Sequence, residues 1–271
     1  MSKLGIIAGN GSFPLLVAQA ARRRQIEVIA VAHLNETDPA LEPLCSRITW
    51  IKVGELERLI ATFTAAGVTR AAMAGGISRA RLKDSFAPDR RALAMLARVG
   101  KFSDDAVLRG VAGELEADGI EVIDPVYLLE NALAEPGTMA GAPPSPAQLN
   151  DLKLAFSVTR ALGPYDIGQA VAVRDGVVAA VEAVEGTDAA IRRAAALCGR
   201  GLVVVKAGKP GQDLRFDRPA IGPNTIELLA EVGAAVLGIE AGCTMILERQ
   251  RTLELAEGQA VTVYGYGYAA A

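Results

Sequence analysis

The stretch that decides the fold is KLGIIAGNGSFPLLVAQAARRRQIEVIAV, which spans residues 3–31. Lys3–Ala8 has the composition of a short strand, and a glycine-containing turn follows it. Pro14 then opens a helix that continues to Arg24, because the apolar residues recur at helical spacing. Glu27–Val31 is a second strand. A strand, a helix and a strand in this order predict two parallel strands joined by a right-handed crossover, and therefore an α/β fold.

Two glycine-containing loops, Gly9–Ser12 and Gly75–Arg79, each follow a predicted strand. Ligands of open α/β sheets bind beyond the carboxyl ends of the strands, so both loops can face the same ligand. Glycine also lets backbone N–H groups approach an anion at the start of a helix. A tight turn between strand and helix is the alternative explanation for the first loop. The residues that we assign to substrate here are Gly9, Gly11, Ser12, Gly75, Gly76, Ser78 and Arg79.

The composition is typical of helices packed on parallel sheets. The 271 residues are 51% hydrophobic and only 4% aromatic, and the formal net charge of −3 gives no field that attracts nucleic acid. The three cysteines are widely spaced and form no metal or disulfide motif, which fits a reducing compartment. Because the sequence shows neither a signal peptide nor about 20 consecutive apolar residues, we expect a cytoplasmic protein, in at most transient contact with the inner membrane.

A Gly-, Pro- and Ala-rich stretch at residues 134–146 is the best candidate for a linker. It predicts two domains, at residues 1–135 and 147–271, with a linker at 136–146. In the second domain, Asp175-Gly176 lies between two β-branched runs and predicts a β-hairpin. The hairpin, the helices and the later strands together predict an α/β domain with a mixed sheet.

The stretch richest in chemical groups is KAGKPGQDLRFDRPAIGPNT, residues 206–225, which follows an apolar strand. Its cations can hold phosphate oxygens, and its carboxylates can hold a divalent metal or activate water. Two shorter motifs, Asp166–Gln169 and Glu185–Asp188, also lie at element junctions. If the hairpin and the following strand share one sheet, two of the three motifs can converge at one end. Turn capping and solvation are the alternatives for each residue taken alone. The candidates are the carboxylates Asp166, Glu185, Asp188, Asp213 and Asp217 and the cations Lys206, Lys209 and Arg215.

His33 is the only histidine, so one chain cannot build a metal site from two or three histidines. We expect it to be a solvated loop residue after the second strand. A metal would then be held by carboxylates, which suits Mg²⁺ or Mn²⁺. Asp104 and Asp105 begin a predicted helix, where they either contact a ligand or, as we favour, cap the helix.

Several motifs are shared with one known family. The longest is Lys-Pro-x-Gln-x-x-Arg-x-Asp-x-Pro-x-Ile-Gly at residues 209–222. The others are Leu-Gly-Ile-Ile-Ala-Gly-x-Gly at 4–11, Ala-Gly-Gly-Ile-Ser-Arg at 74–79, Gly-Lys-x-x-Asp-Asp at 100–105, Asp-Ile-Gly-Gln at 166–169 and Glu-Gly-Thr-Asp at 185–188. In this order, over nearly the whole chain, they resemble the LpxI-type UDP-2,3-diacylglucosamine pyrophosphatases of bacterial lipid A synthesis.

The resemblance implies an N-terminal Rossmann-like parallel-sheet domain and a C-terminal catalytic and lipid-binding domain, with a substrate cleft between them. It implies hydrolysis of UDP-2,3-diacylglucosamine to UMP and 2,3-diacylglucosamine 1-phosphate (lipid X) with Mg²⁺ or Mn²⁺, water attacking the sugar-side phosphorus. Asp217 occupies the critical position of the long motif, and Asn10 stands where many relatives have glycine. The residues assigned on this basis are Asp217, Lys206, Asp188 and Gln169 for catalysis, Asp104, Lys209, Gln212, Arg215 and Thr187 for substrate, and Asp217 and Asp213 for metal.

Two other functional classes remain open on sequence. A nucleotide-dependent oxidoreductase would need a third glycine in the first loop and an acidic residue at the end of the second strand, both of which are missing. A non-catalytic module that binds a nucleotide sugar or a lipid would leave the charged segment at residues 206–217 without a purpose. We expect an apolar groove for the acyl chains in the second domain, and Ala-rich helices that can form a homodimer face.

Overall fold

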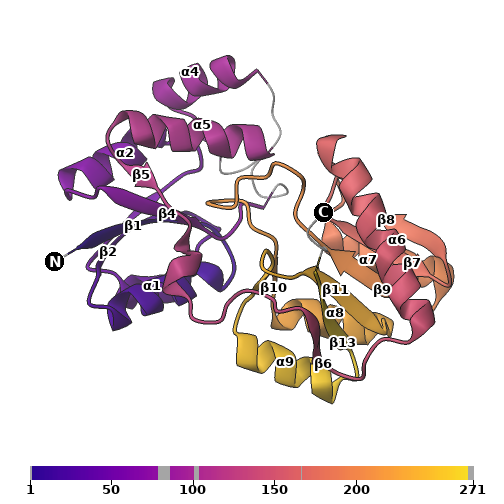
Figure 1. Cartoon of the computed structure of the whole chain (residues 1–271). Coiled ribbons are helices and arrows are strands. Elements are labelled where there is room, and N and C mark those ends of the chain that lie inside the picture. Colours follow the sequence, from indigo (N-terminus) through magenta and orange to yellow (C-terminus); the bar gives the residue numbers. More distant parts are fainter. Residues whose placement is uncertain (1, 79–85, 101–103, 166, 268–271) are drawn as a thin grey trace. The chain divides into compact units, whose positions relative to one another are not determined.

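The computed structural model describes residues 2–78, 86–100, 104–165 and 167–267. The chain divides into two compact units, each built around its own sheet (Figure 1). The N unit consists of Met1–Glu130 with Asp213–Asp217, and the C unit consists of Asn131–Gln212 with Arg218–Ala271. A five-residue segment late in the chain therefore belongs to the N unit.

The N unit contains a five-stranded parallel sheet in the order β3-β2-β1-β4-β5. Its strands are β1 (Lys3–Ala8), β2 (Glu27–His33), β3 (Arg47–Ile51), β4 (Arg70–Ala74) and β5 (Glu121–Val122). Its helices are α1 (Phe13–Arg23), α2 (Leu56–Ala65), α4 (Arg90–Val99) and α5 (Asp104–Ala117), with short 3-10 helices at Pro39–Leu44 and Pro125–Leu128. The expected strand–helix–strand unit and the parallel sheet are both confirmed.

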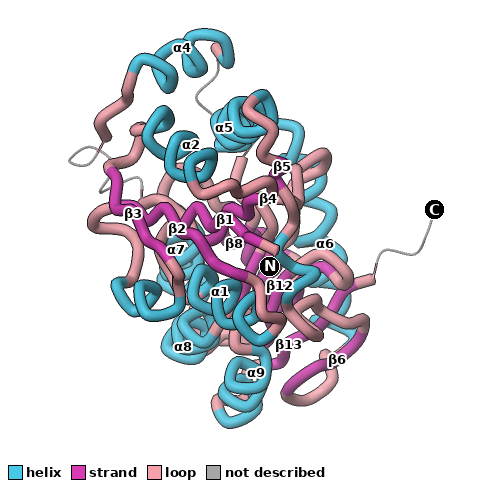
Figure 2. Tube along the Cα trace, turned by 90° about the vertical axis from the view of Figure 1, so that its left-hand side faces the viewer, coloured by secondary structure: helices cyan, strands magenta, loops and turns pink. Residues whose placement is uncertain are grey.

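Alternation along the N-unit strands decides which helix covers which face. In β1, Leu4 and Ile6 pack with α1, whereas Gly5 faces Phe63 of α2 on the other side. A Cβ atom at Gly5 would lie 3.0 Å from the Phe63 ring, so the missing side chain lets α2 pack closely. Figure 2 shows α1 and α2 on opposite sides of β1 and β2. Helices α4 and α5 join α2 on its face.

The C unit contains a six-stranded mixed sheet in the order β6-β13-β11-β9-β7-β8. Its strands are β6 (Gly137–Ala140), β7 (Ala170–Arg174), β8 (Val177–Val181), β9 (Val203–Lys206), β11 (Val236–Glu240) and β13 (Thr262–Tyr266), and a separate parallel pair comprises β10 (Ala220–Ile221) and β12 (Met245–Ile246). Its helices are α6 (Pro146–Leu162), α7 (Thr187–Cys198), α8 (Pro223–Val232) and α9 (Arg249–Gly258), with a 3-10 turn at Gly163–Tyr165. The predicted mixed sheet is confirmed.

Helices cover both faces of the C-unit sheet. Helix α6 packs Leu152 and Phe156 against the valines of β7 and β9 on one face. Helices α7, α8 and α9 bury a second apolar cluster on the other face. The hairpin β7–β8 turns at Asp175, whose positive φ of 50° suits a two-residue hairpin turn. The buried Asp151 of α6 accepts the backbone N–H groups of Asp175 and Gly176 at 3.1 and 2.7 Å and so fixes the turn.

The range 136–146, predicted as a linker, includes strand β6. This strand pairs antiparallel with β13, with Ala140 opposite Val263. The composition of the range reports its tendency to turn but carries no information about a partner strand far along the chain. The contact-based boundary between the units lies at Glu130, close to the predicted end of the first domain at residue 135. Among the described residues, no helix has the length and apolar character to cross a membrane.

Candidate active site

Two glycine-containing loops meet at the carboxyl edge of the N-unit sheet, after the neighbouring strands β1 and β4. The N–H of Gly9 donates to the Ala74 carbonyl and the N–H of Asn10 to the Gly76 carbonyl, both at 2.8 Å. A Cβ atom on Gly9 would lie 2.3 Å from the Gly76 oxygen, so only glycine permits this approach. Because both N–H groups bond within the protein, close loop packing, rather than an anion cradle, accounts for Gly9.

The remaining loop residues predicted to bind substrate lie at the same edge. Gly75 has a φ of +85°, and a Cβ atom there would lie 2.3 Å from the Asn10 carbonyl oxygen. Gly11 has a φ of +83° and open space around its Cβ position. Ser12 is the N-cap residue of α1, and its side chain makes no capping hydrogen bond. Arg79 lies outside the described residues.

The buried carboxylate of Glu36 ties these two loops together. Its Oε2 atom accepts the side-chain amide of Asn10 at 2.8 Å and the backbone N–H of Ser78 at 3.2 Å. Glu36 follows β2 and is only 6% exposed. Asn10 therefore gives the first loop a side-chain contact that a glycine at this position cannot make.

His33 is not the solvated loop residue that the sequence suggested. Strand β2 runs two residues beyond the predicted end, so His33 pairs with Ile51 of β3 and is 8% exposed. Its Nδ1 atom lies 2.9 Å from the Ala8 carbonyl oxygen, which also accepts the Thr37 hydroxyl at 2.6 Å. A bond to a carbonyl requires Nδ1 to carry the proton, which leaves Nε2 as an acceptor. Burial lowers the pKa of His33, opposed by the Ala8 bond and the Glu36 charge, so the ring is neutral at pH 7.

The segment Asp213–Asp217 is anchored to the N unit by an arginine. Arg215 donates from Nε and Nη2 to both oxygens of Asp213, at 2.8 to 3.2 Å, and from Nη1 to Glu116 at 2.7 Å. The Arg215 guanidinium holds the pKa of Asp213 below its usual range. The Phe216 ring packs on the cluster under α2, α4 and α5. Asp213 and Arg215, predicted to bind metal and substrate, thus form an ion pair within the protein.

Asp217 lies at the end of a turn formed by this segment. Its backbone N–H donates to the Asp213 carbonyl at 3.0 Å, and the N–H of Phe216 donates to the same oxygen at 3.3 Å. The turn is therefore fixed by the backbone, by Arg215 and by the Phe216 ring together. The Asp217 side chain is half-buried.

In the C unit, strand directions bring several predicted residues to one edge of the sheet. Strand β7 is antiparallel to β9, so its first residue, Ala170, lies opposite Lys206 at the end of β9. Gln169 precedes β7, and Glu182 follows β8, which pairs with β7. The backbone N–H of Gln169 donates to Glu182 Oε2 at 3.0 Å. The convergence expected for two of the three motifs at one end of a shared sheet is thus present for Gln169 and Lys206.

Glu182 and Lys206 form the electrostatic centre of this edge. Glu182 is 8% exposed, and its Oε1 atom accepts the Thr187 hydroxyl at 3.0 Å. The Lys206 ammonium donates to the Ala220 carbonyl at 2.9 Å. Burial lowers the pKa of Lys206, and the charges of Glu182 and Asp188 oppose that shift. Asp188 itself is exposed in the first turn of α7.

The loop after β9 is held by two further side chains. Glu240, at the end of β11, accepts the backbone N–H of Gly208 at 3.2 Å. Gln212 accepts the N–H of Lys209 through Oε1 at 2.8 Å. The buried atoms Gln212 Nε2 and Gln169 Oε1 have no hydrogen-bond partner among the described residues. Gln212, predicted to bind substrate, and Gln169, predicted to be catalytic, therefore present unsatisfied polar atoms at this edge, which a bound ligand can satisfy.

Comparison with known proteins assigns the chain to a family. The model of the LpxI N-terminal domain matches residues 3–132, and that of the LpxI C-terminal domain matches residues 135–264. A protein of Caulobacter vibrioides named UDP-2,3-diacylglucosamine pyrophosphatase LpxI is 34% identical over 280 residues, and the match covers 98% of each chain. This chain belongs to the LpxI family.

Solved structures of other proteins share only a distant likeness with this LpxI-family chain. The biotin carboxylase subunit of pyruvate carboxylase is 14% identical, with a TM-score of 0.28 over 75% of this chain and 44% of that one. The ADP-bound biotin carboxylase domain of a thermophilic 2-oxoglutarate carboxylase is 13% identical, with a TM-score of 0.25 over 64% of this chain and 35% of that one. The chain spans less than half the length of these proteins, and a likeness of this size supports no conclusion about fold or function.

Sequence reasoning missed three carboxylates that hold loops in this LpxI-family protein. Glu36, Glu182 and Glu240 each accept backbone N–H groups of loops that carry predicted site residues. A glutamate at or within three residues of the end of an apolar strand is the signal that marks all three. The motif residue Asp166 lies outside the described residues, and Asp104 begins α5 with its side chain outside the description.

The described residues do not build a metal site on their own. Among residues 2–78, 86–100, 104–165 and 167–267, no three His, Cys, Asp or Glu side chains cluster closely enough to hold an ion. Asp213, predicted as a ligand, has both oxygens bound by Arg215. Asp217 is the other carboxylate of that segment. Mg²⁺ commonly binds through one or two carboxylates and substrate phosphates, and this limited donor set fits that mode alone.

Proposed function

We propose that this chain hydrolyses the pyrophosphate bond of UDP-2,3-diacylglucosamine and releases UMP and 2,3-diacylglucosamine 1-phosphate. The observation that carries the proposal is the match over 98% of the chain to a protein that bears the name of this activity. The cations and carboxylates among the predicted site residues suit such a substrate, whose pyrophosphate is anionic and whose hydrolysis needs an activated water.

The protein groups divide the chemistry between binding and charge stabilisation. Lys206, fixed by the Ala220 carbonyl and partly desolvated, stabilises the negative charge that develops as the bond breaks. Gln169 and Gln212 offer buried polar atoms to the polar part of the substrate. Asp217, held at the end of its turn, orients the attacking water or a cation that comes with the substrate.

The divalent cation is part of the same proposal. We infer that Mg²⁺ or Mn²⁺ enters with the pyrophosphate and that Asp217 is its protein ligand. A bound cation would polarise the phosphate oxygens and lower the pKa of a coordinated water. Arg215 binds both oxygens of Asp213, which speaks against Asp213 as the ligand.

The test is UMP release from UDP-2,3-diacylglucosamine by chelator-treated protein, with and without Mg²⁺ or Mn²⁺. Asp217→Asn should lower kcat by about 10²–10⁴, the range for loss of a group that acts on the transferred proton. Asp213→Asn is the matched control, because it lies in the same turn and should reduce stability more than turnover. In H₂¹⁸O the label should enter the sugar phosphate, since water attacks the sugar-side phosphorus.

Each outcome separates one part of the proposal. Tight substrate binding by folded wild type without UMP release would show a non-catalytic binding module. Release that persists in chelator would remove the cation from the mechanism. Near wild-type turnover of Asp217→Asn would refute the role of Asp217.

A further inference from the structure

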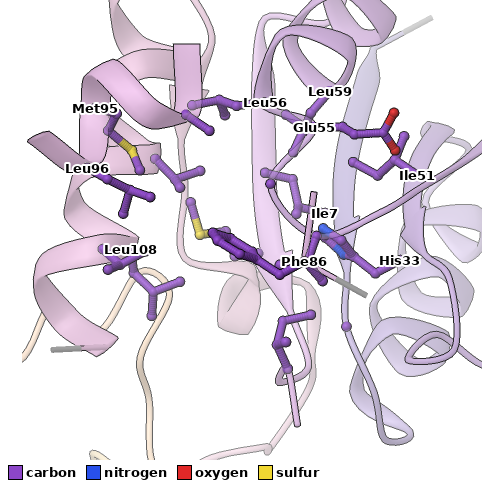
Figure 3. Close-up of a pocket in the computed structure, with 18 of the residues that line it drawn as sticks. Ile7, His33, Ile51, Glu55, Leu56, Leu59, Phe86, Met95, Leu96 and Leu108 are labelled. Atoms are coloured by element: carbon purple, nitrogen blue, oxygen red, sulfur yellow. The ribbon is translucent and has the colours of Figure 1, made fainter. Parts of the chain in front are cut away.

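A cavity of about 190 Å³ lies within the N unit, between one face of the sheet and helices α2, α4 and α5. Figure 3 shows side chains of the sheet and of the helices directed into it from both sides. Its walls include Ile7, Leu56, Met73, Met95, Leu96 and Leu108. The sequence placed an apolar groove in the second domain, whereas this cavity lies in the first.

The chemistry of the lining selects a hydrocarbon ligand. Among the described lining residues, His33 and Glu55 alone carry polar side chains. A uracil ring presents two carbonyl oxygens and one N–H, and a sugar presents several hydroxyls, all of which need partners when buried. An aliphatic chain needs none, and it gains free energy from every methylene removed from water.

The apolar lining remains incompletely buried in the structure. Ile7, Leu96 and Leu108 are only half-buried, although they face the interior between sheet and helices. Phe86 also lines the cavity and is 47% exposed. Large apolar surface left accessible beside a core marks a site for an apolar partner or ligand.

Two residues that the sequence predicted to bind substrate also line the cavity. Gly9 and Gly75, at the carboxyl ends of β1 and β4, belong to the lining. The cavity therefore starts at the edge where open α/β sheets bind ligands and continues beneath it toward α4 and α5. This layout suits a molecule with a polar head at the sheet edge and an apolar tail between sheet and helices.

We propose that the cavity receives one acyl chain of the diacylated substrate. The inference rests on the proposed function, which supplies the ligand that has both a pyrophosphate and acyl chains. A methylene occupies about the volume of a water molecule, roughly 30 Å³ in the liquid, so the cavity has room for about six carbons of a chain. Chain length beyond these carbons should add little to binding in this cavity.

The experiment compares hydrolysis of substrates with tetradecanoyl and butanoyl chains by wild type and two matched variants. Leu96→Trp fills the cavity from α4, whereas Leu93→Trp places the same side chain on the exposed side of that helix. Wild type should prefer the long-chain substrate in kcat/KM by about tenfold or more, the effect of the first methylenes in an apolar pocket. Leu96→Trp should lower the long-chain kcat/KM more than the short-chain value and so abolish most of that preference, and Leu93→Trp should alter neither value.

The proposed acyl site would be refuted if wild type showed no preference for the long-chain substrate. It would also be refuted if folded Leu96→Trp kept that preference. If Leu96→Trp does not fold, Val111→Phe fills the cavity from α5 and takes its place. Absence of hydrolysis of either substrate by wild type would refute the proposed function instead. In that case, binding of a fluorescent fatty acid by wild type and by Leu96→Trp decides the cavity separately, with a loss of about tenfold or more expected in the variant.

Discussion

Replacement of Glu182 tests whether the C-unit edge is organised by a buried carboxylate. In the structure Glu182 is 8% exposed and accepts the Gln169 N–H and the Thr187 hydroxyl, each at 3.0 Å. Its charge also supports the ammonium of Lys206, whose pKa burial lowers. Alanine at this position removes both acceptors and the countercharge at once.

The magnitude follows from these contacts. A buried donor that loses a charged acceptor costs about 1–3 kcal/mol, and Glu182→Ala leaves two such donors, the Gln169 N–H and the Thr187 hydroxyl, and also removes the negative charge near Lys206. We therefore expect Glu182→Ala to lower the free energy of unfolding by about 3–5 kcal/mol. Glu182→Gln keeps the shape and one acceptor oxygen, so a smaller loss of about 1–3 kcal/mol is expected.

The pH dependence of the stability loss distinguishes a lost charge interaction from a packing defect. The folded pKa of Lys206 lies below its value of 10.5 in an unfolded chain, and without the Glu182 charge it falls further. Between the folded pKa and 10.5 the unfolded state binds more protons, so stability rises with pH in this window. The deficit of Glu182→Gln relative to wild type should therefore narrow as the pH rises toward 10.5.

The assay is urea unfolding at pH 7 and at several values up to pH 10, followed by circular dichroism. Glu185→Gln is the matched control, because this carboxylate is exposed and pairs with Arg193 on the surface, where ion pairs contribute little. A loss for Glu182→Ala no larger than that for Glu185→Gln would refute the organising role of Glu182. A pH-independent deficit of Glu182→Gln would refute its coupling to Lys206.

Three further predictions follow from the described residues. His33 is the only histidine, so NMR should show a single imidazole titration, with a pKa below 6.5. The free energy of unfolding should fall as the pH drops below 6.5, because the unfolded chain takes up the proton first. A titration midpoint at or above 6.5 would contradict the buried neutral ring. Gly9→Ala should lower the free energy of unfolding by about 1–3 kcal/mol, because its Cβ would lie 2.3 Å from a carbonyl oxygen of the neighbouring loop. Gly11→Asn should cost much less, because asparagine tolerates the positive φ at this open position. Equal losses for the two variants in urea unfolding would contradict the close packing of the two loops. Burial raises the pKa of the Cys45 and Cys243 thiols to about 11. An aromatic disulfide reagent at pH 7 should therefore label the exposed Cys198 quickly and these two cysteines slowly. Equal labelling rates for all three thiols would contradict this prediction.

The elements that sequence predicted best are those specified by local pattern. Lys3–Ala8 forms β1, and the hairpin at Asp175 forms as its Asp-Gly pair indicates. In both cases the signals lie within a few residues of one another. Helix α6 similarly begins where Ser145 and Gln148 form a capping box.

The errors occurred where a distant partner decides the structure. His33 extends β2 because β3 offers it a neighbouring strand, and β6 forms because β13 is available far along the chain. Neither partner can be identified from the composition of the segment itself. For Asp213, a second interpretation was available within the segment itself. Arg215 lies only two residues away and binds the carboxylate bidentately, so the Asp-x-Arg spacing already contained the alternative.

The convergence of site residues at the sheet edges depends on strand order. The sequence could therefore predict it only for the case that the strands in question are neighbours. Gln169 and Lys206 meet since β7 runs antiparallel to β9, an orientation that the hairpin signal alone does not determine. The loops at Gly9 and Gly75 meet since β1 and β4 are neighbours, although two strands separate them in sequence. The topology of the sheet thus supplies the step between a set of motifs and an edge where they lie together.

The same arrangement holds the loops at the sheet edge in each unit. In each unit a buried glutamate follows a strand and accepts two hydrogen bonds. Glu36 accepts the side-chain amide of Asn10 and the N–H of Ser78, and Glu182 accepts the N–H of Gln169 and the hydroxyl of Thr187. A buried carboxylate is costly unless its acceptors are satisfied, so each loop is confined to the geometry that satisfies them. Positioning the loops in advance reduces the entropy lost when substrate binds. Loss of either carboxylate should therefore weaken substrate binding as well as folding, although neither residue needs to touch the substrate.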